Sequence, residues 1–254
     1  MSVYDPVAPH FDAHRGLPVG VPEAIRAAVR RAAGQPAPRI LDLGCGSGRI
    51  GLPFVAAGDD YVGADLSSGM LREFRQRAAA RLVQADGQAL PFRGAAFDAV
   101  LLIQVFGGMR GWRKVIAEAR RVLGRAGSLI LGRTSMPADG IDARMKRELA
   151  DILRGLGMER DRQNARDDIV QSLDQDAASR ESVTAATWSG RRTPRGFIER
   201  HGSGARFSAL PQDVKARALR DLGAWAVTAF GSLDQAFDEP HTFELEIFRF
   251  KDGN

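Results

Sequence analysis

Apolar and polar positions in the first half of the chain follow two alternating patterns, one typical of strands and one typical of helices. Helical spacing predicts a helix from about 21 to 33 and another from Trp112 to Leu123, which Gly124 stops. Strands are predicted over five runs, 40–43, 62–65, 81–86, 97–106 and 128–132, and the fourth contains a continuous apolar stretch. Such alternation predicts a doubly wound α/β fold with a parallel sheet, which binds ligands at the carboxyl ends of its strands.

The pattern changes after the fifth of these runs. Helical periodicity extends over 141–156, a polar and charge-dense stretch occupies 158–181, and a short strand is predicted around 183–188. A further helix is expected from about 211, and 241–250 alternates apolar and polar residues before it becomes fully apolar. These features predict a helical cap followed by a final antiparallel strand.

The length of 254 residues is enough for one large core and a smaller cap. We therefore expect three parts along the chain. An N-terminal cover and the first helix occupy 1–34, and a ligand-binding core occupies 35–135. A cap insertion and the C-terminal strands that complete the sheet occupy 136–254.

The composition argues against a nucleic-acid partner and against a membrane span. The formal net charge is +5, but only four of the 36 basic residues are lysine and acidic residues are interspersed. A nucleic-acid surface needs a clustered basic patch, so we expect no such partner. No apolar stretch approaches the roughly 20 residues that span a bilayer, and the first residues form neither a basic nor an apolar leader. We therefore expect a cytoplasmic protein without a membrane span.

The sequence ILDLGCGSGRI, which contains the first predicted strand, indicates a buried strand that leads into a glycine turn and a helix. Gly44, Gly46 and Gly48 permit a tight turn and a close approach of backbone N–H groups to a ligand. A dinucleotide-binding G-x-G-x-x-G pattern would need glycine where Arg49 stands. The observed G-x-G-x-G, preceded by Asp42, resembles the first motif of the class I S-adenosylmethionine-dependent methyltransferases.

This resemblance implies a Rossmann-like, mostly parallel, seven-stranded sheet, with S-adenosylmethionine as the cofactor and S-adenosylhomocysteine as its product. It is strong over 38–133 and only topological beyond. The segment YDPVAPHFDAHRG at 4–16 also resembles the N-terminal cover of small-molecule (type 11) methyltransferases, including those of quinone biosynthesis. The likeness implies that Tyr4 and Phe11 exclude water and that Arg15 binds the methionyl carboxylate. A frayed terminus packed on the sheet is the alternative.

The resemblance assigns the glycine turn to the sugar and methionyl portion of the cofactor. The backbone at Gly44 and Gly46 approaches the ligand, and Asp42 favours the methionyl ammonium directly or through water. Cys45 is interpreted as a small packed residue whose backbone touches the ligand. Together with Gly48, these residues form the first part of the predicted cofactor site. A turn that only connects strand and helix is the alternative.

The ends of the second and third predicted strands supply the other part of this site. Asp65 is expected to accept hydrogen bonds from both ribose hydroxyls, although it also suits the cap of the following helix. Leu66 and Met70 flank adenine or belong to the core. Asp86 and Gly87 resemble the third family motif, in which a carboxylate accepts from the adenine amino group and the next N–H meets a ring nitrogen. The predicted cofactor-binding set is completed by Gln88 and Gln104.

The residues after the fourth predicted strand bear on the reaction class. Methyltransferases that act on adenine or cytosine amino groups place a D/N-P-P-Y/F/W sequence there, whereas this chain has QVFGG from Gln104. Cys45, the single cysteine, lies in the glycine turn, so a cysteine adduct with a pyrimidine lacks its nucleophile. We therefore expect a small organic acceptor, methylated by in-line displacement in a water-excluded pocket.

An arginine-rich segment in the predicted cap bears on the acceptor. The arginines of 190–207 are Arg191, Arg192, Arg195, Arg200 and Arg206. They fit contacts to an acidic substrate, contacts to RNA phosphates, or a solvated loop. Trp188, Trp225 and Phe230 line an apolar substrate pocket or belong to the core. A small acidic or aromatic molecule is thus the expected acceptor.

A general base is needed only if the acceptor loses a proton. His14 and His201 are the candidates, because histidine titrates near neutral pH and both lie in segments expected to border the pocket. A structural role is the alternative for each. The histidines are too scattered to indicate a metal site. An rRNA or tRNA methyltransferase and a nonmethylating protein with this fold are the alternative functions, and the acceptor, the methylated atom and the oligomeric state stay open.

Overall fold

The computed structural model describes residues 4–5, 8–9, 12, 16–106, 111–158, 165–202, 207 and 210–251. The helices are α1 (Val21–Ala33), α2 (Leu52–Ala56), α3 (Ser68–Arg77), α4 (Trp112–Val122), α5 (Ile141–Gly155), α6 (Ala165–Asp176), α7 (Pro194–Gly202) and α9 (Gln212–Phe230). The strands are β1 (Ile40–Leu43), β2 (Tyr61–Asp65), β3 (Arg81–Gln84), β4 (Phe97–Ile103), β5 (Leu123–Ser135), β6 (Ala177–Arg192) and β7 (Phe237–Phe250).

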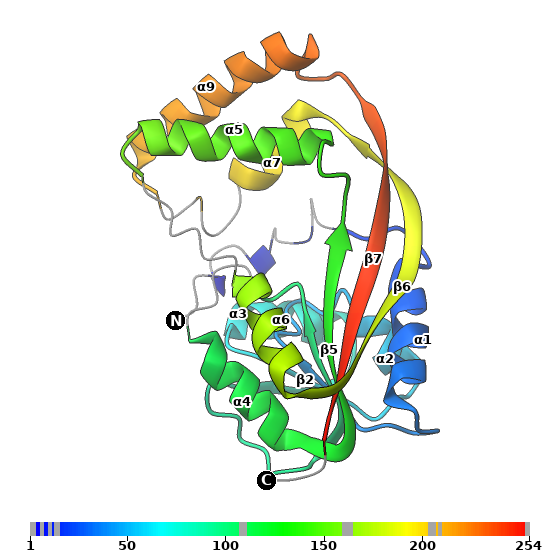
Figure 1. The fold of residues 1–254 in the computed structure, drawn as a ribbon. Coiled ribbons are helices and arrows are strands. Elements are labelled where there is room, and N and C mark those ends of the chain that lie inside the picture. The colour runs from blue at the N-terminus through cyan, green and yellow to red at the C-terminus, as the bar shows by residue number, and fades with distance from the viewer. Residues whose placement is uncertain are drawn as a thin grey trace.

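These strands form one seven-stranded sheet in the order β3-β2-β1-β4-β5-β7-β6 (Figure 1). The strands from β1 to β5 pair in parallel, while β7 is antiparallel to both β5 and β6. The predicted mostly parallel sheet and antiparallel final strand are therefore confirmed. Chain order reverses between β1 and β4, and the crevice at such a switch point is where doubly wound sheets bind ligands.

The first helix and the fourth strand test the predicted boundaries. α1 covers the predicted range, with proline in its first turn and Gly34 at φ 67° after its end. All residues of β4 are buried, as expected of a strand covered on both faces. The predicted extension of this strand to residue 106 is wrong, because Gln104 adopts φ 57° and leaves the extended conformation.

Helix α6 was not predicted, because it lies in the charge-dense stretch that precedes the expected strand. Only Ile169 and Leu173 of this helix are fully buried, which is too sparse a pattern to show helical periodicity. β6 also begins earlier than expected, at Ala177, and ends later, at Arg192. Its first residues pair with the end of β7, where Ala177 lies opposite Phe250.

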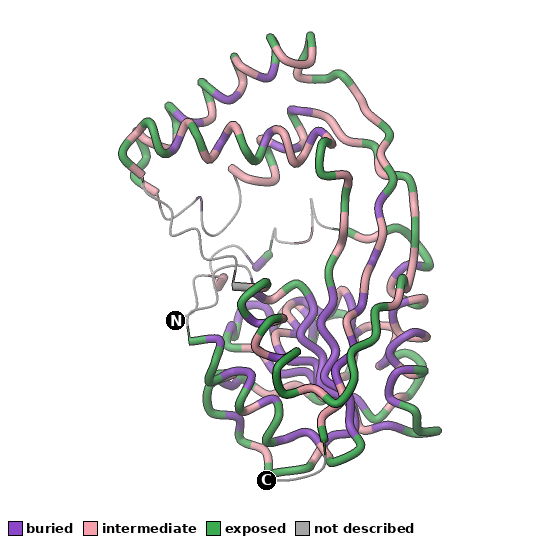
Figure 2. The backbone as a smooth tube through the Cα atoms, in the orientation of Figure 1, coloured by how far each residue is buried: buried purple, intermediate pink, exposed green. Residues whose placement is uncertain are grey.

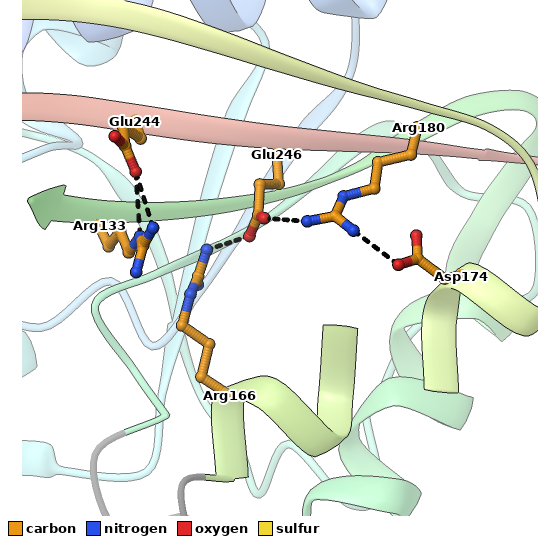
Figure 3. Close-up of polar contacts among 6 residues, drawn as sticks. All are labelled: Arg133, Arg166, Asp174, Arg180, Glu244 and Glu246. Atoms are coloured by element: carbon orange, nitrogen blue, oxygen red, sulfur yellow. Dashed lines mark hydrogen bonds and ion pairs between the residues drawn. The ribbon is translucent and has the colours of Figure 1, made fainter. Parts of the chain in front are cut away.

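Ion pairs hold α6 and β6 against β7 (Figure 3). Glu246 of β7, with a side chain 12% exposed, receives the guanidinium groups of Arg166 and Arg180, the latter at 2.5 Å. Arg180 also contacts Asp174 at 2.6 Å. Burial lowers the pKa of Arg166, and the Glu246 carboxylate opposes that shift. Partly buried ion pairs therefore fix α6 against the sheet, since its apolar periodicity is too sparse to do so.

Helices cover both faces of the sheet. One face packs against α1, α2 and α3 in a core that includes Ile25, Phe54 and Phe74. The other packs against α4 and α6, with Val115 and Leu173 in its core. The buried segments concentrate in the strands between these layers (Figure 2). The core domain is thus a three-layer structure.

The cap has a hydrophobic core of its own. It consists of α5, α7 and α9, and Met145, Phe197 and Leu222 are buried between them. β6 and β7, 16 and 14 residues long, run past the parallel strands to reach these helices. Figure 1 shows the cap beyond the edge at which the parallel strands end. The cap is therefore placed over the ligand-binding edge of the sheet.

Candidate functional site

Glycines in left-handed backbone conformations build the turn after β1. The φ angles are 83° at Gly44 and 88° at Gly48, a region that is strained for other residues. A Cβ at Gly44 would lie 2.4 Å from Cγ1 of Val105, and one at Gly48 would lie 2.5 Å from the ring of Phe74. The N–H of Gly44 donates to the Ala64 carbonyl at 2.7 Å, which joins the turn to β2. The turn therefore requires glycine for both conformation and space.

Asp65 ends β2 beside this turn. Its Oδ2 accepts a hydrogen bond from the N–H of Gly46 at 2.8 Å, and its Oδ1 accepts one from the N–H of Ser67 at 2.8 Å. Burial raises the pKa of Asp65, and the two N–H groups oppose that rise. The two N–H groups therefore fix this carboxylate in position. Because each carboxylate oxygen has two lone pairs, the group keeps acceptor capacity for a ligand.

Asp42 is buried in β1, just before the glycine turn, and is 2% exposed. Its Oδ2 accepts a hydrogen bond from the hydroxyl of Tyr61 at 2.7 Å. Burial raises the pKa of Asp42 to about 7, which the Tyr61 hydroxyl opposes and the Asp65 charge reinforces. Sequence reasoning did not predict this partner, because Tyr61 is one aromatic residue at the start of a strand with no motif around it.

The residues predicted to surround adenine differ in exposure. Leu66 is 54% exposed, whereas Met70 is 3% exposed. Asp86 is exposed, and its Oδ1 accepts from the N–H of Gln88 at 2.9 Å in a local turn. Gly87 is partly buried, and a Cβ there would lie 3.4 Å from Val115 of α4. Leu66 and Asp86 are thus accessible to a ligand, and the adenine contacts of all four predicted residues stay predictions.

Cys45 packs into the core under the glycine turn. It is 7% exposed, and its Sγ would lie 2.8 Å from a Cβ at Gly63. Burial raises the pKa of its thiol well above the ordinary value. A thiol in such surroundings is a poor nucleophile, in agreement with the packing role predicted for it.

Gln104 connects the ends of β4 and β5. Its N–H donates to the Gly132 carbonyl at 2.9 Å, and its Nε2 donates to Oγ1 of Thr134 at 2.9 Å. It is exposed and is one of two non-glycine residues with positive φ among those that the structure describes. Strained backbone held by surrounding contacts is frequent at functional sites. The sequence placed Gln104 near the site but gave no sign of this conformation.

Two aspartates bind the N-terminal cover to the site. Asp12 accepts from Oγ of Ser47 in the glycine turn at 2.8 Å, and its carboxylate lies 2.5 Å from Nη1 of Arg77. Asp5 accepts from Oγ of Ser67 at 2.6 Å and from the N–H of Gly69 at 3.1 Å, at the start of α3. The acidic positions of the predicted cover motif therefore make its anchoring contacts, which the sequence did not reveal.

Several predicted residues of the cover lie outside the described residues. These residues are His10, Phe11, His14 and Arg15. Gly107, Gly108 and Arg206, elsewhere in the chain, also lie outside the described residues. Tyr4 is partly buried. The predicted roles of His14 as a base and of Arg15 at the methionyl carboxylate stay predictions.

His201 is held within the cap. It belongs to α7, where its Nδ1 lies 3.0 Å from the Phe197 carbonyl oxygen and its ring stacks on Phe197 at 3.8 Å between centroids. Burial lowers its pKa, an effect that the Phe197 carbonyl opposes and the Arg200 charge reinforces. These contacts are those of a structural histidine, and its role as a base stays a prediction.

Arginines of the predicted basic segment pair with cap carboxylates. Arg195 forms two hydrogen bonds with Asp234, at 2.6 and 2.8 Å. Arg200 does the same with Asp142, also at 2.6 and 2.8 Å. Nε of Arg192 lies 3.7 Å from the same Asp142. These three contacts favour a structural role for this part of the segment.

The aromatic residues predicted near an acceptor pocket fall in two places. Trp225 and Phe230 pack edge to face in the cap, with centroids 5.5 Å apart, and both adjoin its core. Trp188 lies on β6, where its ring contacts His241 at 5.4 Å. They do not form one cluster, and Trp188 packs against the core of the sheet.

Comparison with known proteins identifies the family. The family model described as a methyltransferase domain matches residues 41–131, from β1 to β5. The chain is 35% identical over 147 residues to the demethylmenaquinone methyltransferase of Thermus thermophilus, which covers 54% of this chain and 67% of that protein. The chain belongs to the S-adenosylmethionine-dependent methyltransferases. The family resemblance predicted from the glycine turn is therefore confirmed, and S-adenosylmethionine is the cofactor of this family.

A second relative and a solved structure extend this comparison. The chain is 34% identical over 142 residues to the demethylmenaquinone methyltransferase of Renibacterium salmoninarum, covering 55% of this chain and 60% of that protein. The chain thus spans about 60% of the length of that relative. The YcgJ protein of Bacillus subtilis shares the fold, with a TM-score of 0.58, 19% identity and coverage of 91% of this chain and 99% of the other. Within the described ranges, the chain has no helix with the length and hydropathy of a membrane span.

Proposed function

We propose that this protein transfers a methyl group from S-adenosylmethionine to a small organic molecule. The observation that carries the proposal is Asp65, whose carboxylate is fixed beside the glycine turn by the N–H groups of Gly46 and Ser67. A carboxylate at the end of the second strand suits a ribose diol, because it accepts two hydrogen bonds at once. Leu66, exposed beside it, supplies apolar surface for a flat base.

The shape and charge of the site fit this cofactor. A Cβ at Gly46 would meet no atom within 4 Å, so the turn has open space where its N–H meets Asp65, and Asp42 lies just before the turn. Two carboxylates suit a ligand that carries an ammonium and a sulfonium as well as a diol. We propose that Asp42 receives the ammonium, Asp65 the ribose, and Asp86 the adenine amino group.

The cofactor, when bound, supplies a methyl group that is already activated for nucleophilic displacement. The protein's own task is to bind, to orient and to exclude water. Asp5 and Asp12 hold the N-terminal cover on the glycine turn and on α3. The cap lies over the same edge of the sheet (Figure 1). We propose that cover and cap together enclose the acceptor beside the cofactor.

The acceptor is proposed to be a small aromatic or acidic molecule. Two relatives are named demethylmenaquinone methyltransferases, which supports an aromatic acceptor. Arg195 and Arg200 are engaged by Asp234 and Asp142, which argues against a run of unpaired cations for RNA. We assign no general base, since His201 bonds within its own helix and only an acceptor with an acidic proton needs one.

The test has a binding stage and a transfer stage. Calorimetry should show S-adenosylhomocysteine binding at least 100-fold more tightly than NAD, since the turn lacks the dinucleotide pattern. Incubation with methyl-labelled cofactor should then label a naphthoquinol or a small carboxylic acid, and not total RNA. Binding to NAD alone would refute the proposal that S-adenosylmethionine is the cofactor. Labelled RNA that resists physiological salt would favour an RNA methyltransferase, and tight binding with no labelled product would favour a nonmethylating protein.

A further inference from the structure

Packing of the Tyr61 ring against two other aromatic rings directs its hydroxyl at the carboxylate of Asp42. Tyr61 is 2% exposed, and its ring lies between Phe54 and Phe74, with centroids 5.6 and 6.3 Å away. Both phenylalanines are fully buried. The ring therefore has little freedom, and its hydroxyl is directed at one acceptor, Oδ2 of Asp42, at 2.7 Å.

The neighbouring backbone leaves room for this hydroxyl. A Cβ on Gly51, at the start of α2, would lie 2.2 Å from the Tyr61 oxygen. The same Cβ would lie 2.8 Å from Cζ of Phe74 and of Tyr61, so glycine at 51 makes space for the hydroxyl as well as for the rings. A buried hydroxyl costs free energy unless it finds a partner. Asp42 provides that partner.

The groups around Asp42 have opposing effects on its ionisation. The groups that face it are Tyr61 and Asp65 of β2 and the Cys45 thiol of the glycine turn, while its β4 neighbour in register, Leu101, is apolar. Burial raises the pKa of Asp42 to about 7, Asp65 raises it further, and the Tyr61 hydrogen bond opposes both. None of these neighbours is cationic, so a bound cation would be the natural partner of the ionised carboxylate.

We propose that Tyr61 is a positioning residue for the cofactor, which holds Asp42 oriented and ionised so that its carboxylate binds the ammonium of the methionyl tail. This inference rests on the proposed function, since it presupposes that the cofactor occupies the glycine turn. Oδ2 is held by the hydroxyl, so the proposal assigns the ammonium to Oδ1, directly or through a water molecule. Cofactor affinity then rises with pH through the range near 7, as Asp42 loses its proton.

The test compares two ligands that differ in the tail. S-Adenosylhomocysteine carries the ammonium, whereas 5′-methylthioadenosine keeps the adenosine and the sulfur and lacks the amino-acid tail. In Tyr61→Phe, which preserves the ring, we expect about 10-fold weaker binding of S-adenosylhomocysteine at pH 7.5 and unchanged binding of methylthioadenosine. The midpoint of the pH profile for S-adenosylhomocysteine should move to higher pH, because the ionised carboxylate has lost a donor.

A second variant tests whether Tyr61 acts through Asp42. In Asp42→Asn the affinity for S-adenosylhomocysteine should lose its pH dependence near 7, and adding Tyr61→Phe should cause no further selective loss. Equal weakening of both ligands in Tyr61→Phe would mean a packing role and would overturn the proposal, as would an unmoved pH midpoint. Wild-type protein that binds neither ligand would instead refute the proposed function.

Discussion

Nη2 of Arg49 donates a hydrogen bond to Oε1 of Gln104 at 3.0 Å, across the switch point of the sheet. Arg49 follows the glycine turn, and its Nε lies 3.4 Å from Oδ1 of Asp12 in the N-terminal cover. Gln104 in turn reaches Thr134 at the end of β5. One chain of polar contacts therefore links the cover, the glycine turn and the ends of two strands. The edge of the sheet that is predicted to bind the cofactor is therefore held together by residues outside the glycine motif as well.

This chain depends on the left-handed backbone at Gln104. Gln104→Ala removes the side-chain contacts and keeps the strain, whereas Gln104→Gly removes both. We expect the alanine variant to be less stable than the glycine variant by about 1 kcal/mol in urea unfolding, because glycine adopts φ 57° at little cost. Both should bind S-adenosylhomocysteine more weakly than the wild type.

Ala95 provides the matched control for this strain. It has φ 54° and no polar side-chain atoms, so Ala95→Gly should stabilise the protein by a similar amount and leave cofactor binding unchanged. Equal stability of the two Gln104 variants would show that the left-handed backbone there carries no strain.

The cover should matter for turnover more than for folding. Asp12→Asn keeps the shape of the side chain and removes its charge toward Arg49 and Arg77. We expect faster dissociation of S-adenosylhomocysteine in stopped-flow measurements and a several-fold lower kcat, since closure completes the dry site in lidded enzymes. The urea midpoint should hardly change. Deleting residues 1–16 should have the same effects more strongly and leave a folded core.

An exposed ion pair serves as the control for the cover. Asp151 and Arg154 are 60% and 53% exposed on one helix, so Asp151→Asn should alter neither kinetics nor stability measurably. If the Asp12 variant behaved like the Asp151 variant, the cover would not be needed for closure.

The sequence predicted the parts of the fold that depend on local patterns. The continuous apolar stretch of β4 and the capping signals of α1 identify their elements without any partner. α6 escaped prediction, because its position depends on Arg166 meeting Glu246, which lies 80 residues further along the chain. Contacts between side chains so far apart leave no local signal.

The same distinction, between local patterns and contacts of distant residues, applies to the candidate site. Gly44 and Asp65 could be predicted as site residues, because a turn at a strand end restricts the residue type by backbone geometry. Tyr61 and Asp12 were missed, because their roles depend on the positions of Asp42 and Ser47 after folding. Motifs therefore predicted where the ligand binds, and only the structure revealed the residues that hold the motif in place.

Acid should destabilise the protein through a buried histidine of β7. His241 is 1% exposed between Trp188 and Gly190, and its Nε2 is buried without a partner in the described structure. Burial lowers the pKa of His241 below the ordinary 6.5, and the Arg192 charge reinforces that shift. The unfolded chain then takes up the proton first. Stability is therefore retained above pH 6.5 and is lost as the pH falls below it.

Urea unfolding as a function of pH measures this effect. The slope between pH 6.5 and 5 should decrease by up to about 1.4 kcal/mol per pH unit in His241→Asn, because one linked proton is removed. The lowered carboxyl pKa values of Asp59 and Asp98 act in a separate range, below their ordinary 3.8. An unchanged slope in the variant would assign the acid sensitivity elsewhere, for example to His201, whose pKa burial also lowers.

Asp65 gives the most direct prediction about the cofactor. Asp65→Ala removes the proposed acceptor of two ribose hydroxyls, which should weaken S-adenosylhomocysteine binding by about 2–4 kcal/mol in calorimetry. It also removes the acceptor of the Gly46 and Ser67 N–H groups, so the turn itself loses support. Unfolding measured without ligand separates the two effects. The loss in binding should exceed the loss in stability, because a water molecule can satisfy the freed N–H groups.

Asp60 is the matched control for this variant. It precedes β2 at the opposite edge of the sheet, where it forms an exposed ion pair with Arg81. Asp60→Ala removes the same charge from the protein without touching the site, so its cofactor affinity should equal that of the wild type. If Asp65→Ala bound the cofactor within threefold of the wild type, the ribose would have another partner, and Asp65 would act only as the cap of the turn and of α3.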